Sequence, residues 1–391
     1  MIKKMDYAGK TTPEIVDSIL ATAIENPASD IHFDSEQKGF VVRMRIDGIL
    51  YPLELEAHEA EEIISRIKIL AQLDITEHRA PQDGRFEFKV GERPYNIRVS
   101  TMPTIYGEAV ALRILNKDSG IVGLAESGLE PEQLKTVNSI VNSPYGIILV
   151  SGPTGSGKTT FLYSVLETFD CAARNIVTLE DPVESPLPGT RQIQIDENIG
   201  FDFAKSMRGV LRQDPNVIML GEIRDNETAQ LAFQAALTGM LVFSTFHTFD
   251  VPGLVIRLIE MGVPRSVVAH AISGVISTRL VRKICAACAT PYEPSEFEKK
   301  VFLTGDLTGV ELRKGRGCHA CHESGYLGRT GLFEVVPFDD EIRSAFIEQT
   351  SSSDLRDCIK RKITRSMADS AMEKVLNGTT TAEEIIRTIG I

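Results

Sequence analysis

The segment from Gly152 to Thr160, GPTGSGKTT, contains the residue types that a triphosphate site requires. Its spacing fits G-x-x-x-x-G-K-[ST]. Glycines let successive backbone N–H groups face phosphate oxygens, Lys158 brings a charge to the β- and γ-phosphates, and Thr159 offers a hydroxyl to Mg²⁺. A strand pattern precedes the segment and helical spacing follows it, which argues against a glycine-rich turn with an accidental lysine. The sequence therefore predicts an ATP-binding loop (P-loop) made of Gly152, Pro153, Thr154, Gly155, Ser156, Gly157, Lys158, Thr159 and Thr160.

Three further predicted strands end in polar side chains. The first, RNIVTLEDPVE, ends in Glu180 and Asp181, which could hold the water shell of Mg²⁺. The second, NVIMLGEIRD, places Glu222 where a general base would orient the attacking water. Gly221 stands where an aspartate commonly assists the metal, so Mg²⁺ would depend on the P-loop threonine, phosphates and water. The third ends near His247, which either has a structural role or senses the γ-phosphate.

Arginines form a second group of candidates, because an NTPase needs cations on the γ-phosphate when domains or subunits close. Arg98 and Arg113 lie on or beside predicted strands of the N-terminal half. Arg208 and Arg212 lie four residues apart on one face of a predicted helix, and Arg224 follows closely. For all five, solvation of a protein surface is the alternative to contact with phosphate.

Two C-x-x-C pairs, CAAC and CHAC, are separated by 29 residues. Disulfides are rare in the cytosol, and two-residue spacers let each pair chelate one metal from a tight turn. Thiolates suit a closed tetrahedral Zn²⁺ site. His319 and His322 are possible substitutes as ligands. The pattern predicts a structural zinc site with the ligands Cys285, Cys288, Cys318 and Cys321.

The elements that must position these residues form two differently patterned regions. Residues 11–25 have helical spacing, and residues 31–99 read as an antiparallel sheet with one inserted helix, which predicts a small α+β domain. A Gly- and Ser-rich stretch follows, and beyond it strands and helices alternate, which predicts a mostly parallel sheet with the P-loop at the carboxyl end of its first strand. The predicted organisation is an N-terminal domain (1–116), a linker (117–128) and an α/β ATPase domain (129–391) that includes the cysteine region (283–327) and a helical C-terminal part (328–391).

Composition narrows the function further. The chain has 391 residues, 42% of them hydrophobic, and a formal charge of −12, which argues against a protein that coats nucleic acid. No N-terminal signal peptide is recognised, and the longest apolar stretch, Leu231 to Phe246, contains polar residues and is too short for a membrane span. We therefore expect a cytosolic protein without direct nucleic-acid partners.

With these residues in place, the chain resembles the ATPases of type II secretion and type IV pilus assembly, the GspE/PilB-like family. The resemblance covers nearly the whole chain. Its motifs appear in the family's order: SDIHFD, RAPQDGR, VSTMPTIYGE, GPTGSGKTT, TLEDPVE, LRQDPNVIMLGEIRDNETAQLAFQAALTG, STFHT, TRLVRKICAAC and CHACHESGYLGRTGLFE.

This resemblance implies a RecA-like motor domain preceded by a PAS-like domain, with six subunits in a ring around bound nucleotides. Lys158 and Thr159 then match the Walker A positions, and Glu222 matches the catalytic glutamate. Glu180 and Asp181 match the family's Asp box, His247 its His box, and the four cysteines its zinc-binding insert. The arginines that match those gathering on the nucleotide across domains and subunits are Arg98, Arg113, Arg208, Arg212 and Arg224.

The function implied is ATP hydrolysis at the cytoplasmic face of the inner membrane. The ring would drive an integral platform protein that lifts pilin-like subunits. Retraction motors typically lack the zinc insert, so assembly or secretion is favoured. A retraction motor, a DNA-translocating motor and an ATP-gated scaffold are the alternatives. Family members usually carry a further N-terminal docking domain, so we expect either a shortened chain or a short member such as those of competence-type systems.

Overall fold

The computed structural model describes residues 9–37, 39–53, 60–115, 121–302, 311–348 and 351–390. They fall into two compact units. Of the described residues, the first unit holds those up to residue 115 together with the segments Cys285–Ala289 and Gly315–Gly328, and the second unit holds the rest. The predicted linker lies partly outside the described residues, and the predicted domain boundaries stay predictions.

The N-terminal part is a six-stranded antiparallel sheet in the order β3-β2-β1-β6-β5-β4. Between β2 and β3, Asp47 and Gly48 both have positive φ, the conformation that a two-residue hairpin turn requires. The predicted antiparallel sheet is present, and it continues beyond residue 99 to Leu115. The elements are α1 (Thr12–Glu25), β1 (Ala28–Glu36), β2 (Gly39–Ile46), β3 (Ile49–Leu53), α2 (Ala60–Leu70), β4 (Gln82–Val90), β5 (Arg93–Thr104) and β6 (Gly107–Leu115).

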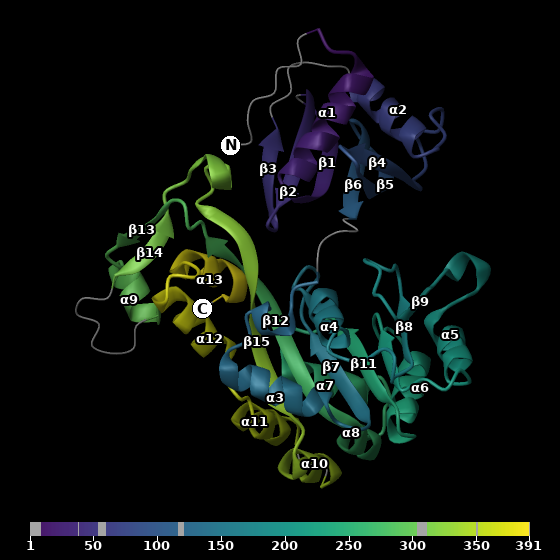
Figure 1. The fold of residues 1–391 in the computed structure, drawn as a ribbon, viewed down its shortest axis with the longest axis vertical. Helices are drawn as coiled ribbons and strands as arrows, with labels where there is room; N and C mark the ends of the chain where they lie inside the picture. Colours follow the sequence, from purple (N-terminus) through teal and green to yellow (C-terminus); the bar gives the residue numbers. More distant parts are fainter. Residues whose placement is uncertain are drawn as a thin grey trace. The chain divides into compact units, whose positions relative to one another are not determined.

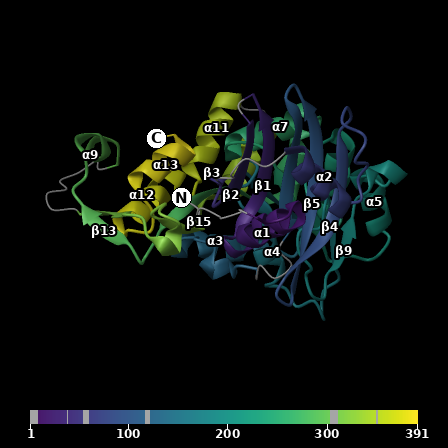
Figure 2. The same cartoon turned by 90° about the horizontal axis from the view of Figure 1, so that it is seen from above.

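Helices α1 and α2 cover one face of this sheet (Figure 1, Figure 2). Apolar side chains at alternate strand positions, such as Ile31, Phe33 and Leu112, pack against Ile15 and Ile19 of α1. Because successive strand residues point to opposite faces, the residues between them lie on the face that these helices leave uncovered.

The second unit is built on a seven-stranded sheet in the order β15-β12-β7-β11-β10-β8-β9 (Figure 1). The pairings from β12 through β9 are parallel, as the alternating pattern predicts. The P-loop follows β7, the first strand of this sheet, at its carboxyl end. The strands are β7 (Gly146–Ser151), β8 (Ile176–Glu180), β9 (Arg191–Gln194), β10 (Val217–Leu220), β11 (Leu241–Phe246), β12 (Ile272–Ile284) and β15 (Tyr326–Pro337).

Both faces of this sheet are covered, which is why its central strands are apolar throughout. In β7, Ile147 and Leu149 pack into a core formed with α5, α6, α7 and α8, while Ile148 and Val150 pack into a second core formed with α3 and α4. These helices are α3 (Pro131–Val141), α4 (Lys158–Leu166), α5 (Phe203–Val210), α6 (Asn226–Leu237), α7 (Val251–Glu260) and α8 (Arg265–Ala271).

The C-terminal helices follow β15. Polar side chains cap them: Ser351 accepts from the N–H of Asp354 at the start of α11, and Thr381 accepts from the N–H of Glu384 at the start of α13. The helices are α10 (Asp340–Ile347), α11 (Ser352–Arg361), α12 (Met367–Leu376) and α13 (Ala382–Ile389).

The elements between β12 and β15 are short: β13 (Ala289–Tyr292), α9 (Glu296–Phe302), β14 (Leu312–Gly315) and the 3₁₀ turn η3 (His319–Cys321). Two further 3₁₀ turns are η1 (Leu124–Glu126) and η2 (Glu197–Ile199).

Candidate functional site

The P-loop joins β7 to α4 and curves around the amino group of Lys158. Lys158 Nζ donates to the carbonyls of Gly152 at 2.7 Å and Pro153 at 3.0 Å. Gly157 has φ 90° where α4 begins, a conformation that glycine adopts without strain. Gly152 is tightly packed as well, because a Cβ at this position would lie 2.6 Å from the carbonyl oxygen of Thr278. The loop thus has the compact form of a phosphate cradle.

Lys158 is a buried cation, with only 8% of its surface exposed. The pKa of Lys158 is lowered to about 8, chiefly by burial; the Glu222 carboxylate opposes this shift, and the charge of Arg279 adds to it. A buried ammonium without a charged partner is costly, so this site favours an anion near Lys158. Triphosphate would supply that anion.

Glu222 and His247, from the ends of neighbouring strands, meet beside this lysine. His247 Nε2 lies 3.0 Å from Glu222 Oε2, and Lys158 Nζ lies 3.4 Å from His247 Nδ1. An ammonium can only donate, so Nδ1 accepts and Nε2–H donates to Glu222 in this arrangement. The structure therefore brings three sequence-predicted residues into one chain of contacts, because parallel strands β10 and β11 end at the same edge of the sheet.

Arg224 joins the same cluster. It forms an ion pair with Glu222, and its Nη1 lies 3.7 Å from Asp181 Oδ2. The largest cause of its raised pKa is the hydrogen bond to Glu222. Asp181, with 40% of its side chain exposed, is thereby held at the rim of the cluster and accessible to solvent. Thr159, in the first turn of α4, is half-buried.

Glu180 differs from its neighbour Asp181, although the sequence groups the two. It is 2% exposed, and both of its carboxylate oxygens accept hydrogen bonds from side chains of the protein. The donors are the hydroxyls of Tyr163 and Thr178 and the amide of Gln192. The predicted catalytic role of Glu180 stays a prediction.

The prediction that Arg208 and Arg212 lie on one face of a helix is wrong for Arg212, which lies outside the helix. Helix α5 ends at Val210, so Arg208 lies in its last turn and Arg212 lies two residues beyond it. Arg208 forms an ion pair with Glu227, and Arg212 Nη1 donates to the Arg208 carbonyl at 2.7 Å. Asp214 has φ 50° and precedes a proline, which disfavours continuation of the helix.

Arg98 and Arg113 form part of a row of charges across the N-terminal sheet. They lie directly opposite one another on β5 and β6, and Arg85 of β4 lies opposite Arg98. Opposite residues share a face, and this is the face that α1 and α2 leave uncovered. Asp30 accepts from Arg113 Nε at 2.9 Å. Like charges directly opposite destabilise a sheet, so this row favours an anionic ligand.

The four predicted zinc ligands form a cluster. Their sulfur atoms all lie within 4.8 Å of one another. The pairs Cys285–Cys318, Cys288–Cys321 and Cys318–Cys321 are 3.9, 3.8 and 3.7 Å apart between sulfurs. Four sulfurs at Zn–S distances of about 2.3 Å in a tetrahedron are about 3.8 Å apart, so the cluster could hold Zn²⁺.

The surroundings of these sulfurs also suit thiolates. Burial alone would raise the pKa of Cys321, but N–H groups of Cys318 and Gly325 point at its sulfur and lower that pKa to about 7. Burial raises the pKa of Cys288 to about 12 in the absence of a metal. A bound cation would offset that cost by favouring the deprotonated sulfurs.

Arg279 is a residue near the site that sequence reasoning missed. It lies on β12, which pairs with β7, and Thr278 beside it donates to the Ser156 carbonyl at 3.2 Å. Its guanidinium donates to the carbonyls of Thr278 at 2.9 Å and Phe249 at 2.8 Å, so it holds the turn that follows His247. The sequence carried no signal for this role, because Arg279 is 121 positions beyond Lys158 and only the strand order brings them near.

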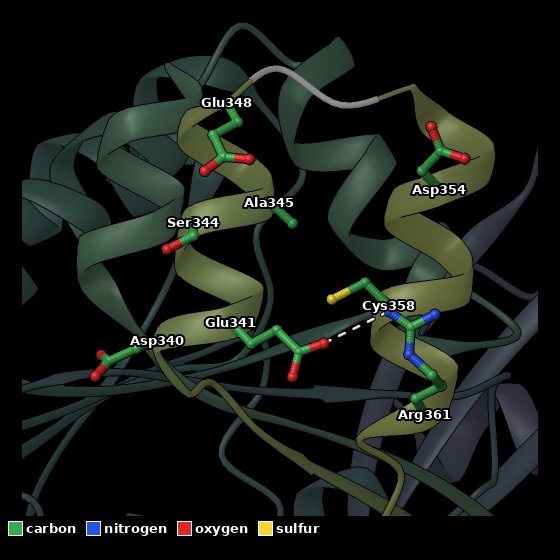
Figure 3. A pocket seen from close by; sticks show the side chains of 8 residues that line it. All are labelled: Asp340, Glu341, Ser344, Ala345, Glu348, Asp354, Cys358 and Arg361. Carbon is green, nitrogen blue, oxygen red and sulfur yellow. Dashed lines mark hydrogen bonds and ion pairs between the residues drawn. The ribbon is translucent and has the colours of Figure 1, made fainter.

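A surface hollow of about 510 Å³ lies elsewhere, between α10 and α11 (Figure 3). Carboxylates, among them Glu341 and Asp354, line it together with Arg361 and Cys358. It shares no residue with the P-loop or the Glu222 cluster. It therefore adds nothing to the nucleotide site.

Comparison with known proteins identifies the family. The family described as "Type II/IV secretion system protein" matches residues 8–387. This chain belongs to that family. The Type II secretion system protein E of Pseudomonas aeruginosa is 44% identical over 374 residues, which cover 95% of this chain and 74% of that protein. The Type IV pilus assembly ATPase PilB of Thermus thermophilus is 40% identical over 380 residues, covering 96% and 43%.

Solved structures show the same fold as this family member. The Legionella pneumophila ATPase DotB has a TM-score of 0.73 at 21% identity and covers 97% of this chain and 96% of its own. The pilus retraction motor PilT with bound ADP has a TM-score of 0.62 at 24% identity, covering 95% and 96%. The predicted family and the predicted α/β fold are confirmed. None of the helices in the described part of the chain has the length and apolarity needed to cross a bilayer.

Proposed function

We propose that this protein is the ATP-hydrolysing motor of a type II secretion or type IV pilus assembly machine. One observation carries the proposal: a P-loop lysine, a carboxylate and a histidine form a connected chain at the carboxyl edge of a parallel sheet. Relatives named for type II secretion and for type IV pilus assembly, at 44% and 40% identity, support the choice of machine.

In this proposal ATP takes the place of contacts within the site. Lys158 exchanges the carbonyls of Gly152 and Pro153 for phosphate oxygens. Arg224 turns from Glu222 toward phosphate, which frees the Glu222 carboxylate to orient a water for in-line attack on the γ-phosphorus. His247 donates from Nε2 to Glu222 and fixes its orientation.

Mg²⁺ would be held by Thr159, with Asp181 acting through water, and would neutralise charge on the phosphates. Zn²⁺ would be held by the four clustered cysteines and would brace their two loops without entering the reaction. Three sulfur–sulfur distances of 3.7–3.9 Å, in a cluster whose sulfurs all lie within 4.8 Å of one another, support this assignment.

The remaining arginines are proposed to act when subunits assemble. Arg98, which is half-buried, and Arg113, which is exposed, lie opposite one another and suit phosphate, and Arg208 and Arg212 lie near the end of α5. We propose a ring of six copies at the cytoplasmic face of the inner membrane, without direct contact to nucleic acid. There the N-terminal domain (1–116) would close against the motor domain (129–391) around the linker (117–128), and the ring would act on an integral platform protein and, through it, on pilin-like subunits.

The proposal is tested with Glu222→Gln, which keeps the shape of the side chain and removes its charge. We expect binding of a fluorescent ATP analogue to be retained and phosphate release to fall by about a hundredfold or more. Glu260→Gln, an exposed change on α7, is the matched control and should keep both. Unchanged turnover in Glu222→Gln would refute the assignment of the base.

The machine is tested by affinity capture from membranes of the native cells, with ATP held by Glu222→Gln. Recovery of an integral pilus or secretion platform protein supports the proposal. Recovery of DNA would favour a translocase, and the absence of any membrane partner would favour a scaffold.

A further inference from the structure

The buried carboxylate of Glu180 connects three elements of the second unit. The Tyr163 hydroxyl, from α4, donates to Oε2, and Thr178 Oγ1, from the same strand β8, donates to Oε1 at 2.5 Å. Gln192 Nε2, from β9, donates to Oε1 at 3.2 Å. Tyr163, Thr178 and Glu180 are each at most 3% exposed. Burial and the adjacent carboxylate raise the pKa of Tyr163, so its hydroxyl keeps the proton it donates.

The same side chains hold the loop between β8 and β9. Gln192 accepts from the N–H of Leu187 at 2.6 Å and donates to the Ser185 carbonyl at 2.9 Å, and the N–H of Glu184 lies 3.4 Å from the Tyr163 hydroxyl. This loop begins at Asp181, the carboxylate that faces Arg224. The position of α4 is thus linked to the position of Asp181.

The end of β8 also supports the segment that carries Glu222. The N–H of Gly221 donates to the Leu179 carbonyl at 2.7 Å. A Cβ at position 221 would lie 3.2 Å from that carbonyl oxygen and 3.5 Å from Glu180 Cα. The backbone at the end of β8 is therefore in close contact with Gly221, the residue before Glu222.

We propose that Glu180 is a positioning residue that couples the P-loop helix, through Tyr163, to the strand ends bearing Asp181 and Glu222. Internal donors occupy three of the roughly four lone-pair sites of the Glu180 carboxylate, and the residue is only 2% exposed, so Mg²⁺ or its waters would reach it only by displacing these donors. Displacing them would leave the hydroxyls of Tyr163 and Thr178 without this acceptor, which is costly in a buried site. Asp181, which is accessible, remains for the metal's waters. Tyr163, Thr178 and Gln192 become part of the positioning network.

The kinetic readouts of this proposal rest on the proposed ATPase function. Three variants of the full chain are compared with the wild type: Tyr163→Phe, Glu180→Gln and the double variant. Tyr145→Phe and Glu167→Gln, both exposed, are the matched controls. For each, ATP turnover is measured against Mg²⁺ concentration, and binding of a fluorescent ATP analogue is measured separately.

We expect Tyr163→Phe and Glu180→Gln each to lower kcat roughly tenfold to a hundredfold while half-saturating Mg²⁺ and analogue affinity stay within about twofold. The double variant should be no slower than the slower single variant, because each substitution acts on the same contact between Tyr163 and Glu180. A rise in half-saturating Mg²⁺ in Glu180→Gln alone would assign it to the metal and overturn the proposal. Full turnover in Tyr163→Phe, with or without a lower melting temperature, would overturn it as well.

Hydrogen exchange of the nucleotide-free protein separates this proposal from the ATPase assignment. Exchange of the backbone in residues 217–224 should accelerate in Tyr163→Phe and Glu180→Gln and in neither control. Absence of that change refutes the positioning role even if the wild type hydrolyses ATP. Conversely, if the wild type does not hydrolyse ATP but the two variants show this faster exchange, the proposed function is refuted and the positioning network is supported.

Discussion

Nucleotide affinity should fall as pH rises above about 8, because Lys158 then loses the charge that attracts phosphate. In the nucleotide-free protein, burial lowers the pKa of Lys158 to about 8. Bound phosphates favour the ammonium and raise this pKa again. Well below pH 8 Lys158 is charged both with and without nucleotide, so the affinity does not depend on pH. Above pH 8 the lysine must take up a proton when nucleotide binds, so the affinity becomes weaker.

The size of the effect follows from the titration of this one group. With a free-state pKa of about 8, the charged fraction falls about tenfold between pH 7 and pH 9, which corresponds to about 1.4 kcal/mol of binding free energy. Glu222 raises the pKa of Lys158 by its charge. Removing that charge in Glu222→Gln should therefore shift the onset of the decline to lower pH.

The assay is fluorescence anisotropy of a non-hydrolysable fluorescent ATP analogue, with saturating Mg²⁺ and constant ionic strength from pH 7 to pH 9. Lys158→Arg is the matched control, because arginine keeps its charge over this range and its affinity should not depend on pH. A flat affinity in the wild type would refute the reasoning. The same decline in Lys158→Arg would show that another group titrates.

Three further predictions concern residues outside this titration. Purified protein should contain about one Zn²⁺ per chain by elemental analysis. Cys321→Ser should lose this zinc, whereas Cys171→Ser, a change outside the cluster, should keep it. Zinc retained by Cys321→Ser would exclude this site. Arg98→Ala should lower turnover at least about tenfold, whereas Arg43→Ala, whose partner is Asp34, should not; equal losses would point to a general effect on the sheet. Arg279→Gln should lower kcat several-fold by loosening the turn after His247, with Arg361→Gln as control; wild-type turnover would contradict that role.

Much of the candidate site could be predicted because its residues follow strands. Lys158, Glu222 and His247 each follow an apolar run of parallel-sheet type, and such runs end at a common edge. The sequence could not divide Glu180 from Asp181, since adjacent carboxylates look alike in a motif. The division depends on the pleat, which turns Glu180 toward Tyr163 of α4 and leaves Asp181 at the rim.

By itself the sequence determined the P-loop, the four-cysteine site, the order of strands and helices, and the family. These features depend on the spacing of residues close together in the sequence. Glycines at fixed positions mark the P-loop, two-residue spacers mark the cysteine pairs, and apolar runs mark the strands. Tertiary structure alone decided which side chains act together. Strand order puts β12 beside β7 and brings Arg279 near Lys158, and register aligns Arg85 with Arg98 and Arg113. Such contacts join residues distant in sequence, and only the packing of strands and helices creates them.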